Sequence, residues 1–130
     1  LKTQSAGVLI GSPVGGTMMP ILQAAVGRRT RLIHPVGLEK RVERPIGELA
    51  ALANRSNDGK GLRLLQSCGE VFTELNAIEA LFSLRAYLLA AGGVCGAEGS
   101  VLLTLSGSEE NLLRAERYFR SIQDTPSFSL

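Results

Sequence analysis

Short apolar runs bounded by glycine alternate with segments of helical periodicity along this 130-residue chain. A run of strand length that ends at a glycine is typical of a buried strand rather than of a helix. Runs of this kind occupy residues 6–10, 31–36, 62–66, 86–91 and 101–105. Because the last two flank a glycine-rich connection, we expect them to form a hairpin.

The segments between and after these runs carry helix signals. The predicted helices cover residues 18–26, 46–53, 71–84 and 108–122. Thr17 is a favourable N-cap for the first helix, and Gly27 is a favourable stop. The third helix has the strongest pattern, since its apolar residues recur at helical spacing along one face: Val71, Leu75, Ile78 and Phe82.

The resulting order, β-α-β-α-β-α-β-β-α, predicts an α/β fold with a mostly parallel sheet. We expect a single domain over residues 1–123, because the chain is long enough to bury its own core, and an extended or disordered tail at 124–130. Right-handed crossovers would bring the loops that follow the strands to one edge, where open α/β sheets bind ligands. The converging loops would be 11–17, 37–44, 67–70 and 92–99.

Composition adds an expectation about partners and location. Hydrophobic residues make up 45% of the chain and charged residues 20%, as in globular proteins. A mean hydropathy of +0.15 is slightly high for so small a chain and favours a homo-oligomer whose subunits cover some apolar surface. No apolar run approaches the roughly 18 residues of a membrane-spanning helix. No secretory signal is visible, so we expect a cytoplasmic protein, although a removed leader before Leu1 stays open.

Charge and residue counts disfavour several classes of partner. The net charge of +2 is too small to indicate nucleic acid, and 5% aromatic residues without tryptophan disfavour a base-stacking platform. Two cysteines and one histidine cannot build a structural zinc site, so no metal site is expected. The same two cysteines form no disulfide framework, which favours reduced thiols.

The loop 11–17 (GSPVGGT) invites a phosphate-binding interpretation. A Walker A loop requires lysine and then serine or threonine after its second glycine, whereas this chain has Thr17 and Met18, so a nucleotide triphosphatase is disfavoured. The dinucleotide fingerprint is also absent. Exposed N–H groups at the start of the following helix could still bind a small anion, with the Thr17 hydroxyl assisting. The alternative is a tight corner whose glycines serve only the backbone.

The predicted ligand-binding set extends this loop with basic residues and a second glycine-rich loop. Residues 27–44 form the basic part of the chain, although such a cluster can equally be solvated or pair with a neighbouring subunit. The set comprises Ser12, Gly15, Gly16 and Thr17 around the anion, Lys40 and Arg41 as added charge, and Gly92, Gly93 and Gly96 as one wall.

A second hypothesis is a small acid/base or thiol enzyme. Cys68 lies just before a predicted helix, where a thiol can become nucleophilic, and His34 is the one histidine that could act as its base. The alternative for Cys68 is a small buried hydrophobic residue. Glu70 and Glu98 are the candidate carboxylates, since both fall in loops expected at the convergent edge.

Part of the chain resembles the second half of bacterial microcompartment shell domains. This part comprises the segment 76–84, the strand pair within 86–107 and the closing helix. The resemblance covers about forty residues of pattern and implies a structural, self-assembling protein. The first half, with GSPVGGT and HPVGLEK, does not share the pattern, and no counterpart of the lysine at the shell hexamer edge is found.

The leading hypothesis from the sequence is therefore a small homo-oligomeric protein that binds a small anionic, possibly phosphorylated, metabolite at the glycine-rich loops. The enzyme using Glu70, Glu98 or Cys68 and the self-assembling structural protein are the alternatives. The sequence predicts no particular cofactor.

Overall fold

The computed structural model describes residues 5–55 and 60–126. The chain divides into two compact units: Leu1–Val36 with Lys40–Phe72, and Gly37–Glu39 with Thr73–Leu130. The single domain expected over residues 1–123 stays a prediction. The end of the predicted tail at 124–130 lies outside the described residues.

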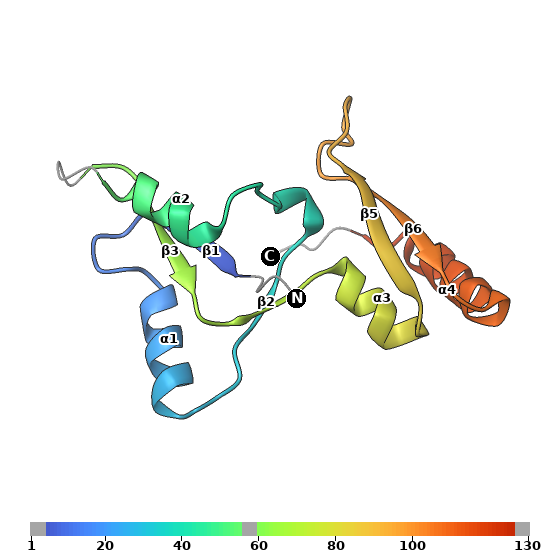
Figure 1. The fold of residues 1–130 in the computed structure, drawn as a ribbon, viewed down its shortest axis with the longest axis horizontal. Helices are drawn as coiled ribbons and strands as arrows, with labels where there is room; N and C mark the ends of the chain where they lie inside the picture. The colour runs from blue at the N-terminus through green and yellow to red at the C-terminus, as the bar shows by residue number, and fades with distance from the viewer. Residues whose placement is uncertain (1–4, 56–59, 127–130) are drawn as a thin grey trace. The chain divides into compact units, whose positions relative to one another are not determined.

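In the first unit, one helix covers a two-stranded antiparallel sheet (Figure 1). Strand β1 (Ala6–Ile10) pairs with β3 (Arg63–Ser67), and helix α2 (Ile46–Ala53) packs on the pair. The packing is close, because a Cβ atom added at Gly7 would lie 3.2 Å from the Ile46 side chain. Glycine in β1 therefore allows α2 to approach the sheet.

The end of α2 is fastened to the outer edge of β3 by one side chain. The Asn54 amide donates to the carbonyl of Leu64 at 2.9 Å, and its oxygen accepts the Leu64 N–H at 3.0 Å. These are both of the backbone hydrogen-bonding groups of Leu64. Asn54 thus takes the place that a further strand would take beside β3 at this position.

The first unit also contains a short parallel pair and an apolar helix. Strand β2 (Ile33–Pro35) pairs with β4 (Glu70–Phe72), so that His34 lies opposite Val71. Helix α1 (Met18–Gly27) precedes β2, and none of its residues is buried.

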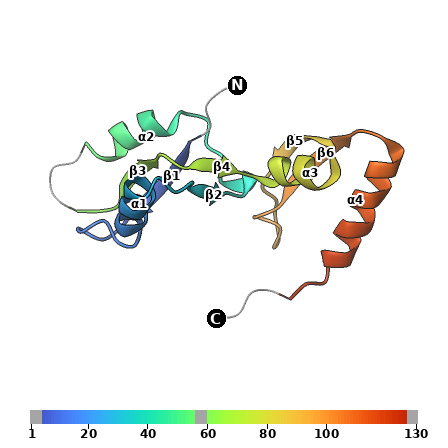
Figure 2. The ribbon, with the colours of Figure 1, turned by 90° about the horizontal axis from the view of Figure 1, so that it is seen from below.

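The second unit is a helix–hairpin–helix arrangement, seen from two sides in Figures 1 and 2. Helix α3 (Glu74–Phe82) leads into β5 (Arg85–Ala91), which pairs antiparallel with β6 (Val101–Ser106) and is followed by α4 (Glu109–Ile122). This confirms the hairpin expected for the last two strands.

Side-chain caps fix the ends of these helices. The Asn76 side-chain oxygen accepts the backbone N–H of Thr73 at 2.9 Å, which satisfies a donor at the start of α3. Ser83 ends α3 with a left-handed φ of 55°. The Ser108 hydroxyl accepts the Asn111 N–H at 3.3 Å and caps α4.

The short 3₁₀ helix η1 (Leu38–Lys40) is anchored to the second unit at its start. The N–H of Leu38 donates to the Glu74 carboxylate, at 3.1 and 3.3 Å from its two oxygens. Leu38 itself is buried. A helical carboxylate therefore satisfies a backbone donor that burial would otherwise leave unpaired.

The core of the second unit lies between the hairpin and its two helices. Its buried members are Ile78, Phe82, Leu84 and Ala115, with Ala86, Leu103, Leu105 and Leu112 packed against them. The ring centroids of Tyr118 and Phe119 lie 5.5 and 5.8 Å from that of Phe82, distances typical of favourable aromatic pairs. The aromatic contacts join α3 to α4.

The mixture of helices and strands agrees with the predicted α/β class, but the mostly parallel sheet is wrong. The described strands form three two-stranded sheets, of which β1–β3 and β5–β6 are antiparallel. The alternation of strands and helices suggested parallel crossovers, but the intervening helices also allow β1 and β3 to meet in opposite directions. No helix of the described residues is long and apolar enough to cross a membrane.

The start of the third predicted helix is also corrected. The spacing of Val71, four residues before Leu75, predicts that it belongs to the helix, but Glu70–Phe72 forms β4, and α3 begins at Glu74. A helical spacing that extends over one residue of a strand cannot reveal the boundary between the two elements.

Replacing Leu84 by alanine should destabilise the second unit by about 2–5 kcal/mol, because a large side chain is removed from a packed core. Leu84 is 1% exposed. The free energy of unfolding from urea titration measures the effect. Leu113→Ala is the matched control, since Leu113 is 50% exposed and its loss should change stability by no more than about 0.5 kcal/mol. Equal effects of the two substitutions would contradict this description of the core.

Candidate functional site

The loop between β1 and α1 forms a compact turn in front of an uncapped helix. The N–H of Gly15 donates to the carbonyl of Ser12 at 3.0 Å, and the N–H of Val14 donates to the Ser12 hydroxyl at 3.3 Å. Gly15 and Gly16 have φ values of 83° and 59°, which disfavour residues with a Cβ atom. The glycines thus give the chain a sharp reversal before α1.

The start of α1 has no side-chain cap. Thr17 occupies the N-cap position, but its side chain makes no capping hydrogen bond, and the first turn contains no acidic residue. Consecutive N–H groups that follow a left-handed residue can form an anion-binding concavity. The candidate donors are the N–H groups of Gly16, Thr17 and Met18.

The antiparallel register separates this loop from the other candidate region. Ile10, which precedes the loop, is opposite Arg63, whereas Ser67, which precedes Cys68, is opposite Ala6. The two loops therefore follow opposite ends of the β1–β3 pair, roughly 13 Å apart at 3.3 Å per residue. Their predicted convergence depended on parallel strands and is wrong.

At the Ser67 end, a serine and the one histidine of the chain are in contact. The Nε2 atom of His34 lies 2.6 Å from the Ser67 hydroxyl oxygen, which also accepts the Gly69 N–H at 3.4 Å. In the tautomer whose Nε2 carries no hydrogen, the Ser67 hydroxyl donates this hydrogen bond and Nε2 accepts it. Because Ser67 is only 4% exposed, the geometry favours a buried structural bond over a serine nucleophile.

This bond places the imidazole directly against Gly69. A Cβ atom at Gly69 would overlap Cδ2 and Nε2 of His34 and would lie 3.0 Å from Cγ of Leu32. Gly69 therefore allows the segment before β4 to pass close to the ring. The hypothesis that His34 serves Cys68 as a base stays a prediction, since the contacts found for the ring are with Ser67 and Gly69.

Two of the predicted catalytic residues, Cys68 and Glu70, line one pocket of the first unit. Its volume is about 280 Å³, and its walls are Ala25, Val26, Thr30, Arg31, Leu32, Cys68 and Glu70. The thiol of Cys68 is exposed. Arg31 donates to Oε2 of Glu70 through Nε at 2.9 Å and through its NH2 group at 2.7 Å.

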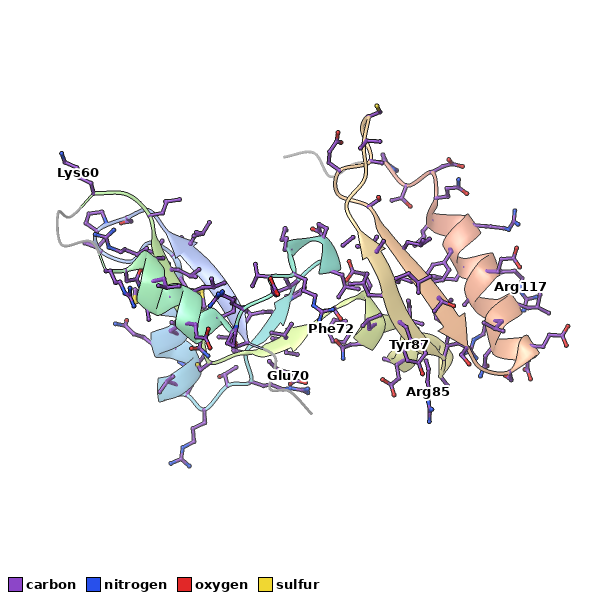
Figure 3. The ribbon with its side chains drawn as sticks, turned by 45° about the horizontal axis from the view of Figure 1, so that its top comes forward. Lys60, Glu70, Phe72, Arg85, Tyr87 and Arg117 are labelled. Atoms are coloured by element: carbon purple, nitrogen blue, oxygen red, sulfur yellow. The ribbon has the colours of Figure 1, made fainter. Side chains whose placement is uncertain are left out.

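The Arg31–Glu70 pair limits what this pocket can do. Both side chains are more than half exposed, so the pair contributes little to stability. Oε2 of Glu70 (labelled in Figure 3) nevertheless accepts from two nitrogens of the Arg31 guanidinium, so the carboxylate is held in an ion pair in the pocket wall. The pocket can hold a small group beside a thiol and an ion pair.

Glu98, the third catalytic candidate, lies in the hairpin loop of the second unit, and its side chain forms a hydrogen bond within that loop. Its Oε1 accepts the N–H of Gly96 at 3.2 Å. Hydrogen bonds from its own backbone N–H and from Gly96 lower the pKa of the exposed Glu98 carboxyl. A lowered pKa makes a weaker general base, so these bonds favour a role in the turn.

The remaining predicted binding residues are distributed over both units. Lys40 ends η1 and is followed by the exposed Arg41, both in the first unit. Gly92, Gly93 and Gly96 belong to the second unit, where the Gly92 N–H donates to the carbonyl of Ser100 at 2.8 Å. In the described ranges 5–55 and 60–126, no group of three His, Cys, Asp or Glu residues could hold a metal ion.

The helix–hairpin–helix order of the second unit follows the pattern on which the resemblance to microcompartment shell domains was based. Comparison of the chain with protein-family models, characterised proteins and solved structures gave no match. The resemblance therefore remains one of local pattern.

The approach of His34 to Gly69 can be tested by substitution. Gly69→Ala should destabilise the protein by about 1–3 kcal/mol, because the new methyl group displaces the imidazole from Ser67. In a His34→Ala background the same substitution should cost at least about 1 kcal/mol less, which a double-mutant cycle from urea titrations measures. Additive effects would show that the ring does not occupy this space.

Proposed function

We propose that this chain is a self-assembling structural subunit whose copies bury one another's apolar surfaces. The observation that carries the proposal is helix α1, which is uncharged over its whole length and apolar except for Gln23, but has no buried residue. A helix that is hydrophobic on all sides is normally surrounded by protein. Within α1, Ile21 and Val26 remain 47% and 68% exposed.

The second unit supports the same proposal through the outward face of its hairpin. Side chains alternate along β5 and β6, and those that point away from the core include Tyr87, Leu89 and Leu102. These are 51%, 61% and 60% exposed (Tyr87 is labelled in Figure 3). An antiparallel sheet with one solvated face usually presents polar residues there, as Arg85, Thr104 and Ser106 do on this face. The large apolar side chains beside them indicate a missing cover.

A second copy of the chain is a suitable cover because identical copies repel one another little. The chain has 14 basic and 12 acidic residues, so that its net charge is +2. A small net charge opposes association only weakly. Self-assembly is also what the resemblance to microcompartment shell domains implies.

Binding of a small anion at Gly15–Thr17 is the second candidate function. It is favoured by the start of α1, where the N-cap residue Thr17 makes no side-chain capping bond and the first turn has no acidic side chain, so that N–H groups are available. The two functions are compatible, because one uses the end of α1 and the other its sides.

Val26→Glu should dissociate the oligomer, because burying an unpaired carboxylate at a subunit contact costs far more than leaving it in water. Native mass spectrometry at micromolar concentration measures the subunit number. Gln23→Glu introduces the same charge at the polar position of the same helix and should keep the oligomer. A monomeric wild-type protein, or an oligomer that tolerates Val26→Glu, would contradict the proposal that α1 is a subunit contact.

Gly16→Asp should weaken binding of inorganic phosphate by about tenfold or more, because a carboxylate replaces open space at the helix N-terminus. Both aspartate and asparagine tolerate the left-handed φ of this position, and a Cβ atom there lies 3.8 Å from that of Ser12. Gly16→Asn is therefore the matched neutral control. Phosphate-dependent NMR shifts of the Gly16, Thr17 and Met18 amides measure affinity, and equal affinity of the two variants would exclude this site.

A further inference from the structure

We infer that the outer edge of β6 pairs with the same edge of a second copy, so that two hairpins form one four-stranded antiparallel sheet. The inference rests on the proposed self-assembly and identifies one surface through which two copies meet.

β6 has an edge with none of the usual protection against pairing. Its sequence, VLLTLS, contains no charge and no proline, and the uncharged stretch extends from Gly99 to Ser108. Natural sheets protect open edges with charged residues, proline or bulges. β6 pairs only with β5, so its second row of N–H and C=O groups has no strand beside it among the described residues.

Every other described strand has a feature that opposes pairing at its edge. β5 carries Arg85 and a register irregularity. On the outer edge of β3, the backbone groups of Leu64 are already bonded to Asn54. β2 contains Pro35, and β4 begins with Glu70. β1 is uncharged but contains Gly7, which weakens a strand. β6 is therefore the edge best suited to a further strand.

An apolar hollow lies beside this edge. Its volume is about 700 Å³, and it is lined by Leu105, Leu112, Glu116, Phe119, Arg120 and Gln123. The hairpin contributes Leu105 from β6 and no residue of β5. The side of α4 that faces α3 is marked by Arg114, which donates to the carbonyl of Leu81 at 2.8 Å. The hollow is therefore on the β6 side of α4, where an added strand would lie.

Two-fold symmetry restricts the registers that the pairing can take. Directly opposite residues of an antiparallel pair point to the same face, so the two-fold axis must lie midway between the two copies of one residue, which then face each other. An axis at Leu103, near the middle of β6, places Leu102 opposite Thr104 of the second copy on the outward face. On the inward face the same axis places Val101 of the second copy opposite Leu105. Since Leu105 lines the apolar hollow, the Val101 side chain of the second copy can enter it.

The absence of charge favours a second copy over a partner of different chemistry. An acidic or basic peptide would find no charge on residues 99–108 to recognise it, whereas two identical uncharged edges meet without repulsion. The backbone hydrogen bonds require only another extended strand, which β6 of the second copy supplies.

Disulfide trapping tests this register in the full-length chain. Exposed Cys68 and Cys95 are first replaced by serine, and Leu102→Cys and Thr104→Cys are made as separate variants in that background. On mild oxidation, a mixture of the two variants should give a covalent dimer on a non-reducing gel. Each variant alone should give little covalent dimer. Two copies of a residue one position from the axis are diagonal neighbours about 7–8 Å apart, which is too far for a disulfide.

Tyr87→Cys is the matched control, because Tyr87 lies opposite Thr104 within the hairpin but on β5. A mixture of Tyr87→Cys with Leu102→Cys should not cross-link efficiently. An oligomeric wild-type protein whose Leu102→Cys and Thr104→Cys variants fail to cross-link would overturn the β6 pairing and leave self-assembly standing. A monomeric wild-type protein in native mass spectrometry would overturn both, and efficient cross-linking of Thr104→Cys with itself would overturn the register.

Discussion

The constraint on which the rest of this structure depends is the number of strands in each sheet. A two-stranded sheet leaves both outer edges open and is marginally stable unless something packs on it. In the described residues, α2 supports β1–β3, whereas α3 and α4 support β5–β6. Each support covers one face. The opposite face of the β5–β6 hairpin keeps apolar side chains in water, as Leu102 shows with an exposure of 60%.

The elements that depend on local signals were predictable from the sequence. The α2 boundaries at Ile46 and Ala53 and the β5–β6 hairpin both follow from neighbours within a few residues of each other. Strand pairing depends on residues far apart in the chain. The pairing of β1 with β3 brings together positions more than fifty residues apart, and the strand–helix order is compatible with either direction. The sequence therefore could not exclude the antiparallel arrangement.

In the candidate site, too, contacts between residues close in the chain were predictable and contacts between distant residues were not. Cys68 and Glu70 line one pocket because they are neighbours in the chain, so their association could be predicted. The bond between His34 and Ser67 joins residues 33 positions apart and depends on how β2, β3 and β4 meet, which no local pattern reveals. Glu98 offers the opposite case. Its bond to Gly96 spans two residues, and a carboxylate in a tight glycine-rich loop is a signal that could have identified its role in the turn.

Assembly and anion binding at α1 would reinforce each other. The N–H groups at the start of α1 would attract an anion through the helix dipole, and this attraction would be screened while the helix is surrounded by water. If other subunits cover Ile21 and Val26, water is removed from the sides of the same helix, and the effective dielectric constant around its end falls. An anion at Gly16 and Thr17 would then be held more tightly in the oligomer than in the monomer. By linkage, the anion would favour the oligomer to the same extent.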